Sequence, residues 1–395
     1  MLLSVKSWCK VNAAQAHSPM YFCAMSMLDT IPEAIEAIRQ GEVIIVVDDE
    51  DRENEGDFLI AARQVTPEVV NFMATHGRGL ICAPLVEDRC DELGLELMVQ
   101  TNNAAYETPF TVSVDLMGHG CTTGISAQDR AKTIQALINP NTSPTELGKP
   151  GHIFPLRAKR GGVLRRAGHT EAAIDFSRLA GFEPAGVIVE IMNEDGTMAR
   201  LAQCRELANQ FNLKLVSIAD LIEYRLLNET LIERTTEVEI QTAFGPFTAI
   251  AFRQLTNDVE HLALIKGQWN EEEDVPVRVH STSMLGDVFQ ITDFGKGPEL
   301  HAAMKQIQKE GKGAIVYINK LRKGKGLIDE LEAYQKKEEA KGPSLDSKDY
   351  GIGAQIIRNL GISRMHILSD TPRKKGIIGY GLEITGTTPL LTQKN

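Results

Sequence analysis

The residues best suited to chemistry form one acidic run, residues 48–57 (DDEDRENEGD), in which seven of ten side chains are carboxylates. Apolar segments, Val43–Val47 and Phe58–Ala62, flank it on both sides. Carboxylates held between two core elements repel one another unless a cation or a charged substrate compensates them. Hard oxygen ligands of this kind suit Mg²⁺ or Mn²⁺. We therefore interpret the run as a metal-binding loop, with a solvated acidic turn as the alternative.

A basic segment, residues 157–175 (RAKRGGVLRRAGHTEAAID), is the second candidate. Its centre, Arg165 to Thr170, places guanidinium groups, a small-residue turn, an imidazole and a hydroxyl directly before a predicted helix. A helix N-terminus and a guanidinium both favour an anion, so this segment is suited to a phosphate. The alternative is a basic helix entry with Thr170 as its cap. His169 is a candidate metal ligand or general base, although a lone histidine is more often structural.

Two further loops carry polar groups. His152 lies in the Gly- and Pro-bounded segment GHIFP, and active-site residues often occupy such loops. Thr123 belongs to the segment TTGIS, which offers hydroxyls and backbone amides at another predicted helix start. The second loop is therefore a further candidate for phosphate binding.

One acid and one thiol stand within apolar runs. Glu190 interrupts the run VIVEIM, where it is either an outward-facing side chain or a buried carboxylate suited to act as a base. Cys82, within LICAP, either packs in the core or lines a pocket.

The elements that must position these residues follow from hydrophobic periodicity between residues 34 and 220. A capping box, Thr30 to Glu33, starts a first helix that Gly41 closes. Strands are predicted at Val43–Val47 and Val187–Met192, with a tight turn at residues 193–196. Helices are predicted at Glu68–Thr75, Ala127–Ile138, Glu171–Leu179 and Arg205–Asn212. The predicted class is α+β, a mixed sheet with surrounding helices.

A second block begins near Glu237, after a predicted helix that runs into a polar connector over residues 221–240. Its strand-like runs are Phe247–Phe252, Val275–His280, Ala314–Ile318 and Met365–Leu368, with helices at Leu300–Glu310 and Gly353–Asn359. This alternation predicts a second α/β domain. Residues 333–348 are charged and contain Gly-Pro, which is typical of a surface loop.

Length and composition agree with this division. A chain of 395 residues favours two domains, and a net charge of −11 argues against nonspecific nucleic-acid binding. No apolar run approaches a membrane span. The six cysteines form no CxxC pair, so a reducing cytoplasm is expected. Residues 1–26 lack acids and are expected to be a disordered leader.

Five colinear motifs, VVDDEDRENEGD, GLICAPL, TTGISAQDRA, GHIFPLRA and GGVLRRAGHTEAAID, closely resemble 3,4-dihydroxy-2-butanone 4-phosphate synthase of riboflavin biosynthesis. The resemblance implies a synthase domain over residues 27–230. It further implies conversion of D-ribulose 5-phosphate to L-3,4-dihydroxy-2-butanone 4-phosphate and formate, with Mg²⁺ or Mn²⁺, no organic cofactor and a homodimer.

The resemblance also implies roles for individual residues. Glu53 and His169 would hold the metal. His152, Glu190, Glu55 and Cys82 are the catalytic candidates. The substrate-binding candidates are Arg52, Glu53, Asp57, Thr123, Arg166, Ala167, Gly168, His169, Thr170 and Glu190. Enolising a ketose requires a base at C3, and the later dehydration requires an acid, so several proton carriers must share one pocket.

The second block, residues 237–395, resembles GTP cyclohydrolase II through VRVHS, GDVF, LHAAM, DYGIGAQ and TPRK. That family binds zinc through three cysteines, and the corresponding positions here hold Ser283, Phe294 and Lys296. The expected nucleophilic arginine is replaced by Lys348, although Asp346 remains.

We therefore expect an inactive cyclohydrolase-like domain without zinc. The alternatives are a bifunctional enzyme that also hydrolyses GTP, or a C-terminal half that binds a regulatory nucleotide or acts as a scaffold.

Overall fold

The computed structural model describes residues 28–50, 52–291, 297–319, 331, 335, 347–370 and 381–391. These residues form two compact units. The first takes those up to Ala158 together with Gly168–Asp220, and the second takes Lys159–Ala167 and those from Leu221 onward. Leader residues 1–26 lie outside the described residues, and the predicted domain boundaries stay a prediction. Every described helix is too short or not apolar enough to span a membrane.

The first unit is built on a seven-stranded sheet in the order β4-β5-β3-β6-β2-β1-β7. The sheet is mixed, because β1 pairs antiparallel with β2 and parallel with β7. Its elements in chain order are α2 (Ile31–Arg39), β1 (Ile44–Val47), β2 (Gly56–Ala61), α3 (Pro67–Gly77), β3 (Cys82–Val86), α4 (Glu87–Glu92), β4 (Val114–Leu116), α5 (Ala127–Ile138), β5 (Leu147–Ala158), α6 (His169–Leu179), β6 (Gly186–Glu190), α7 (Leu201–Phe211) and β7 (Leu215–Ser217). The next helix, α8 (Ile218–Asn228), belongs to the second unit from Leu221 onward.

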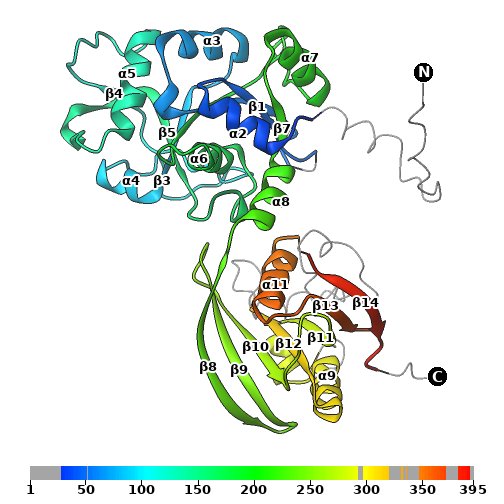
Figure 1. The fold of residues 1–395 in the computed structure, drawn as a ribbon. Coiled ribbons are helices and arrows are strands. Elements are labelled where there is room, and N and C mark those ends of the chain that lie inside the picture. The colour runs from blue at the N-terminus through cyan, green and yellow to red at the C-terminus, as the bar shows by residue number, and fades with distance from the viewer. Residues whose placement is uncertain are drawn as a thin grey trace, which may run out of the picture. The chain divides into compact units, whose positions relative to one another are not determined.

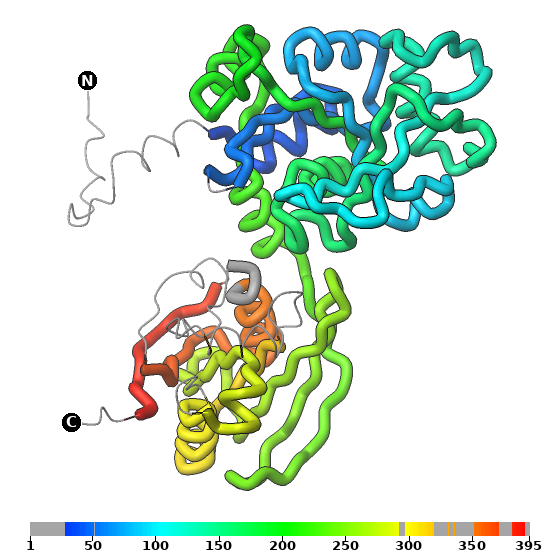
Figure 2. Tube along the Cα trace, turned by 180° about the vertical axis from the view of Figure 1, so that it is seen from behind, coloured from blue at the N-terminus to red at the C-terminus, as the bar shows by residue number. Residues whose placement is uncertain are grey.

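Helices cover both faces of this sheet, as Figures 1 and 2 show from opposite sides. Phe58 and Ile60 of β2 belong to a core that also holds Met73 of α3 and Ile134 of α5. Since strand side chains alternate, Asp57 and Leu59 point to the other face, where α6 packs on β2, β6 and β3. The helix α6 lies close to the sheet at β6.

A side chain at Gly186 would not fit beneath α6. A Cβ atom there would lie 2.8 Å from the Cβ atom of Ala173. Because α6 packs this closely on the sheet, the side chains of β2 that point to this face, such as Asp57, lie on the side that α6 covers.

Local sequence signals explain the element boundaries. Thr30 caps α2 in a capping box with Glu33, as predicted, and Thr66 and Ser126 cap α3 and α5 with their hydroxyls. The predicted turn at residues 193–196 forms, with Gly196 at φ +84°.

The second unit contains another seven-stranded mixed sheet, ordered β14-β13-β11-β12-β10-β9-β8. Figure 2 shows β8 and β9 as a long curved hairpin. The elements are β8 (Ile232–Thr242), β9 (Gly245–Gln254), β10 (Glu260–Lys266), β11 (Asp274–Ser281), α9 (Gly297–Glu310), β12 (Gly313–Ile318), α11 (Ser347–Asn359), β13 (Arg364–Leu368) and β14 (Glu383–Thr388).

One predicted connector is instead a strand. Residues 232–242 form β8, which pairs antiparallel with β9 along its length. It lies at the edge of the sheet, and most of its side chains from Glu233 to Glu239 are exposed, so its sequence reads as polar. The fold class is otherwise as predicted, with two mixed α/β sheets and their covering helices.

Candidate active site and metal centre

The acidic loop between β1 and β2 is folded around one carboxylate. Asp48 Oδ1 accepts the backbone N–H of Glu55 at 2.8 Å, and Asp48 Oδ2 accepts that of Glu53 at 3.2 Å. Oδ2 also accepts Arg52 Nη1 at 2.6 Å, and the Asp48 side chain is fully buried. The sequence marked the loop but did not single out Asp48 as the residue that folds it.

Arg52 neutralises part of the loop's charge. Its guanidinium donates to both carboxylate oxygens of Glu53, at 2.8 and 3.0 Å, in a bidentate pair. It also lies 5.3 Å from the ring of Tyr106, whose hydroxyl donates to the Arg52 carbonyl. Although burial opposes ionisation, His169 and Arg52 hold the pKa of Glu53 below its usual value.

His169, the first residue of α6, faces this loop. Its buried ring lies with Nε2 at 3.1 Å from the Val46 carbonyl, which can only accept, so Nε2 carries a proton and Nδ1 is the nitrogen that faces the acids. Nδ1 is 3.8 Å from Glu53 Oε2 and 3.9 Å from Asp57 Oδ2. Burial alone would lower the pKa of His169, but Asp57 and Glu53 raise it.

These side chains meet the geometric requirement for a cation site. Ligand atoms of Asp48, Glu53 and His169 all lie within 4.8 Å of one another. The hydrogen bond from Nε2 to a backbone carbonyl also orients a histidine ligand in many metal sites. Two of the three are the predicted ligands, Glu53 and His169; Asp48 is the addition.

Asp57 and Glu190 form an acidic pair on adjacent strands. They are direct partners in the antiparallel register of β2 and β6. Asp57 is buried, and its Oδ1 atom has no hydrogen-bond partner. Burial, and then the charges of Glu190 and Glu53, raise the pKa of Asp57. An orphaned buried carboxylate oxygen points to a missing partner such as substrate or cation.

Glu190 reaches the loop before β3. Its Oε2 accepts the Leu80 amide at 2.8 Å. A Cβ atom at Gly79 would lie 2.5 Å from that oxygen, so only glycine leaves the room. Cys82 is buried at the start of β3, and burial, followed by Glu190 and Asp57, raises the pKa of its thiol. The thiol therefore stays protonated at neutral pH. Burial and Glu53 also raise the pKa of half-buried Glu55.

His152 and Thr123 lie in a different setting. Among the described contacts, His152 on β5 pairs with Asp115 at 2.6 Å rather than with the acidic loop. Thr123 is exposed between Thr122 and Gly124, whose amides both donate to the Asp129 carboxylate at 3.1 Å. Those two amides of the predicted phosphate loop therefore donate to Asp129 in this structure and not to a phosphate.

The basic segment is split between the units. Arg166 and Ala167 group with the second unit, where neighbouring Leu164 joins the core with Leu226 and Leu231. Gly168 is the N-cap of α6 in the first unit, and Thr170 is buried in its first turn. The roles predicted for these residues in phosphate binding stay predictions. The sequence gave no signal that residues 159–167 group with the second unit.

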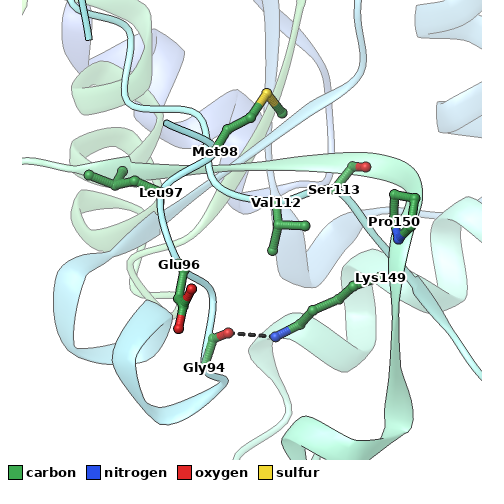
Figure 3. Close-up of a pocket in the computed structure, with 8 residues that line it drawn as sticks. All are labelled: Gly94, Glu96, Leu97, Met98, Val112, Ser113, Lys149 and Pro150. Atoms are coloured by element: carbon green, nitrogen blue, oxygen red, sulfur yellow. Dashed lines mark hydrogen bonds between the residues drawn. The ribbon is translucent and has the colours of Figure 1, made fainter. Parts of the chain in front are cut away.

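A separate groove of about 500 Å³ lies near β4 and β5. Figure 3 shows Lys149 reaching across it to the carbonyl of Gly94, with Leu97 and Met98 on the same loop. Glu96, Val112, Ser113 and Pro150 complete the lining, and none of these residues is a predicted site residue.

In the second unit, the three positions expected to hold zinc ligands are only partly described. Ser283 is buried and its Oγ accepts the Gly286 amide at 3.1 Å. Phe294, Lys296 and Asp346 lie outside the described residues, and only the backbone of Lys348 is described. Within the described part of the chain, the metal-capable cluster found is that of the first unit.

Comparison with known proteins covers both units. Residues 32–224 match the model of the 3,4-dihydroxy-2-butanone 4-phosphate synthase family, and residues 233–389 match that of GTP cyclohydrolase II. "Riboflavin biosynthesis protein RibBA" of Cytophaga hutchinsonii is 57% identical over 378 residues, covering 93% of each chain. The protein of that name from Porphyromonas gingivalis is 52% identical, again over 93% of each.

A solved structure resembles the chain over both units. It is described as RibBX, a two domain 3,4-dihydroxy-2-butanone 4-phosphate synthase from A. baumannii. The identity is 42% and the TM-score 0.74, with coverage of 91% of this chain and 99% of that one.

These comparisons overturn one prediction. The second unit was expected to be a degenerate, inactive cyclohydrolase, yet it matches the GTP cyclohydrolase II family over residues 233–389, and the relatives named RibBA are similar through both domains. The prediction was wrong because it rested on a few substituted positions, and the loss of an expected ligand does not establish the loss of a domain's chemistry.

Proposed function

The chain belongs to the riboflavin-biosynthesis family that joins a 3,4-dihydroxy-2-butanone 4-phosphate synthase domain to a GTP cyclohydrolase II domain, and on this premise we propose that D-ribulose 5-phosphate is converted between the acidic loop and the start of α6. One observation carries the assignment. Asp48, Glu53 and His169 bring their ligand atoms within 4.8 Å beside the orphaned Oδ1 of Asp57.

The donor set fits a hard divalent cation, and we assign Mg²⁺ or Mn²⁺ to it. Glu53 and His169 would hold the ion, with the carboxylate of Asp48 beside them. When bound, such a cation supplies positive charge against an oxygen that becomes negative as a ketose enolises. The residues themselves support this, because two acids and an oriented Nδ1 converge at one point.

The remaining side chains handle protons. Enolisation removes a proton from carbon, and the later dehydration returns one to a leaving hydroxyl. Asp57 and Glu190 are direct cross-strand partners, so one carboxyl group can accept a proton while the other stays charged. Cys82, with its thiol protonated, lies on the neighbouring strand β3, where it pairs with Ile188 of β6, and Glu55 directly precedes β2.

Substrate binding is assigned to Arg52, Arg166 and Thr170, the roles that the family resemblance implies for them. Arg52 sits on the acidic loop, while Arg166 and Thr170 flank the N-cap Gly168 of α6. A guanidinium and a helix N-terminus together favour a phosphate group.

The test is formate release from ribulose 5-phosphate by the full chain. We expect turnover that EDTA abolishes and added Mg²⁺ restores. A chain that binds Mg²⁺ but releases no formate would contradict the proposed function.

A second candidate function is GTP hydrolysis in the second domain. The match of residues 233–389 to GTP cyclohydrolase II favours it. The described residues identify no zinc ligands there, so we derive no step through zinc.

The full chain, loaded with Zn²⁺ or Mg²⁺, should be incubated with GTP and assayed for formate and pyrophosphate. Release of both supports cyclohydrolase activity. Bound but intact GTP, seen by calorimetry, would instead indicate a regulatory nucleotide site. Absence of both binding and turnover would remove both nucleotide functions.

A further inference from the structure

The carboxylate of Asp115 holds His152 at two points. Its Oδ1 accepts the backbone N–H of His152 at 2.8 Å, and its Oδ2 lies 2.6 Å from Nδ1 of the ring. The His152 side chain is 43% exposed, whereas that of Asp115 is only 18% exposed. The contact thus fixes both the backbone and the ring of a histidine that faces solvent.

An irregularity in strand pairing creates this contact. Along β4, Val114 pairs with Ile153 of β5, but the next residue, Asp115, pairs with Gly148. Residues 149–152 are therefore left out of the ladder as a bulge, and bulges commonly re-aim a side chain. The Gly151 amide donates to Ser113 Oγ at 3.1 Å, and Figure 3 shows Ser113 near Pro150, the residue before Gly151.

Two glycines make room for the arrangement. A Cβ atom at Gly124 would lie 2.1 Å from Asp115 Oδ2, and one at Gly151 would lie 2.2 Å from the Asp115 nitrogen. Gly124 also has φ +90°, and its amide is held by Asp129. Gly124 therefore lies against the Asp115 carboxylate, while Gly151 lets the backbone that carries His152 approach the backbone of Asp115.

The chemistry of the pair determines the ring's tautomer. An ionised carboxylate only accepts hydrogen bonds, so Nδ1 must carry the proton that faces Oδ2. The other nitrogen, Nε2, then carries the lone pair. A carboxylate that orients a histidine in this way is a recurrent partner of a general base.

We propose that Asp115 is a positioning residue of the synthase reaction, which holds His152 as the Nδ1–H tautomer so that Nε2 can exchange a proton with the sugar phosphate. This inference rests on the proposed function and on the catalytic role that the family resemblance implies for His152. It adds a residue that acts through His152 and does not itself touch the substrate.

The Asp115→Asn variant keeps the shape of the side chain and changes its hydrogen bonding. If the Asn oxygen still accepts the His152 backbone N–H, its NH₂ group faces Nδ1. Nδ1 must then accept, and the ring proton moves to Nε2. The variant should therefore invert the tautomer without removing a group from the fold.

The chain offers a matched control. His119 Nε2 lies 2.8 Å from Glu146 Oε1 in the same unit, and this pair has no predicted role. Asp115→Asn, Glu146→Gln, His152→Ala and the double variant Asp115→Asn/His152→Ala should be assayed for formate release. Histidine-labelled full chain should be examined by ¹⁵N NMR, with His152→Ala identifying the His152 ring signals.

Asp115→Asn should lower kcat by about 10²- to 10⁴-fold, the usual contribution of general acid–base catalysis, with KM within about threefold. The ¹⁵N signals of His152 should change from the Nδ1–H to the Nε2–H pattern, and the double variant should be no slower than His152→Ala. Glu146→Gln should stay within about threefold of wild type.

Several results would overturn the inference. An unchanged tautomer, additive losses in the double variant, or near-wild-type kcat in Asp115→Asn while His152→Ala is inactive would each do so. Wild-type activity of His152→Ala is a different failure, since it removes the proposed role of His152 itself. The tautomer measurement then still decides whether Asp115 controls the ring.

Discussion

At the scale of single residues, the site is an assembly of charges that compensate one another only in part. Arg52 pairs with Asp48 and Glu53, but Oδ1 of Asp57 is buried without a partner. A buried unpartnered carboxylate oxygen costs free energy that the fold would otherwise avoid. A ligand that brings positive charge would give this oxygen the partner it lacks.

Asp48 should matter for metal binding even if it does not contact the ion. Asp48→Asn removes the charge that holds Arg52 and weakens the acceptor of two loop amides. Groups that orient metal ligands typically change affinity by about 10- to 100-fold. We expect a loss of that size in Mn²⁺ affinity, measured by electron paramagnetic resonance. The exposed neighbour Asp49 provides the control, and equal losses in Asp49→Asn would show a general charge effect instead.

At the scale of elements, the site depends on α6 lying close to the sheet, because His169 is its first residue. Gly186→Ala would place a Cβ atom 2.8 Å from that of Ala173 and push the helix outward. Overpacking of this kind costs about 1–3 kcal/mol. The variant should lower both the unfolding midpoint in urea and the affinity for Mn²⁺.

Gly353→Ala is the control for that substitution, since its nearest neighbour would be 3.6 Å away, in ordinary contact. It should leave Mn²⁺ binding unchanged. If Gly186→Ala were destabilised but bound Mn²⁺ as wild type does, the position of α6 would not govern the site.

The sequence predicted those elements whose periodicity and caps agree. The helix Ala127–Ile138 was predicted with its exact bounds, and Val43–Val47 differs from β1 by one residue. The prediction of a polar connector at β8 was wrong, because an exposed edge strand carries a polar pattern that resembles a connector. Periodicity reports which side chains are buried, so an edge strand gives only a weak signal.

The site was predictable only in part. The motif resemblance named Glu53 and His169. In the structure, Nδ1 of His169 lies 3.8 Å from Oε2 of Glu53, although the two residues are 116 positions apart in the sequence. Asp48 was one acid among seven, and its role depends on backbone amides that the sequence does not reveal. Asp115 is a single acid in the segment VSVDL, where nothing indicated that an irregularity in strand pairing would place it against His152.

At the scale of the whole molecule, we expect a homodimer. The strand β4 lies at the edge of the first sheet. Four apolar residues of the same unit are each about half exposed: Leu97, Met98, Met117 and Ile125. An edge strand beside exposed apolar side chains is a favourable site for a second copy of the chain.

Light scattering after size-exclusion chromatography should therefore give twice the 43.5 kDa chain mass. The double variant Met98→Glu/Met117→Glu should shift the mass toward the monomer, while Val238→Glu, at a side chain of similar exposure on β8, should not. A monomeric wild type would contradict the expectation.

The most direct test compares two acids of the same loop. Glu53 offers its carboxylate to the cluster with Asp48 and His169, whereas Glu50 is exposed three residues earlier. The rate of formate release from ribulose 5-phosphate should be measured at saturating Mg²⁺ for Glu53→Gln and Glu50→Gln. Glu53→Gln should lose at least about 10²-fold in kcat with the fold intact, and Glu50→Gln should stay within about threefold of wild type. Equal activity in the two variants would contradict a catalytic centre at the acidic loop and the start of α6.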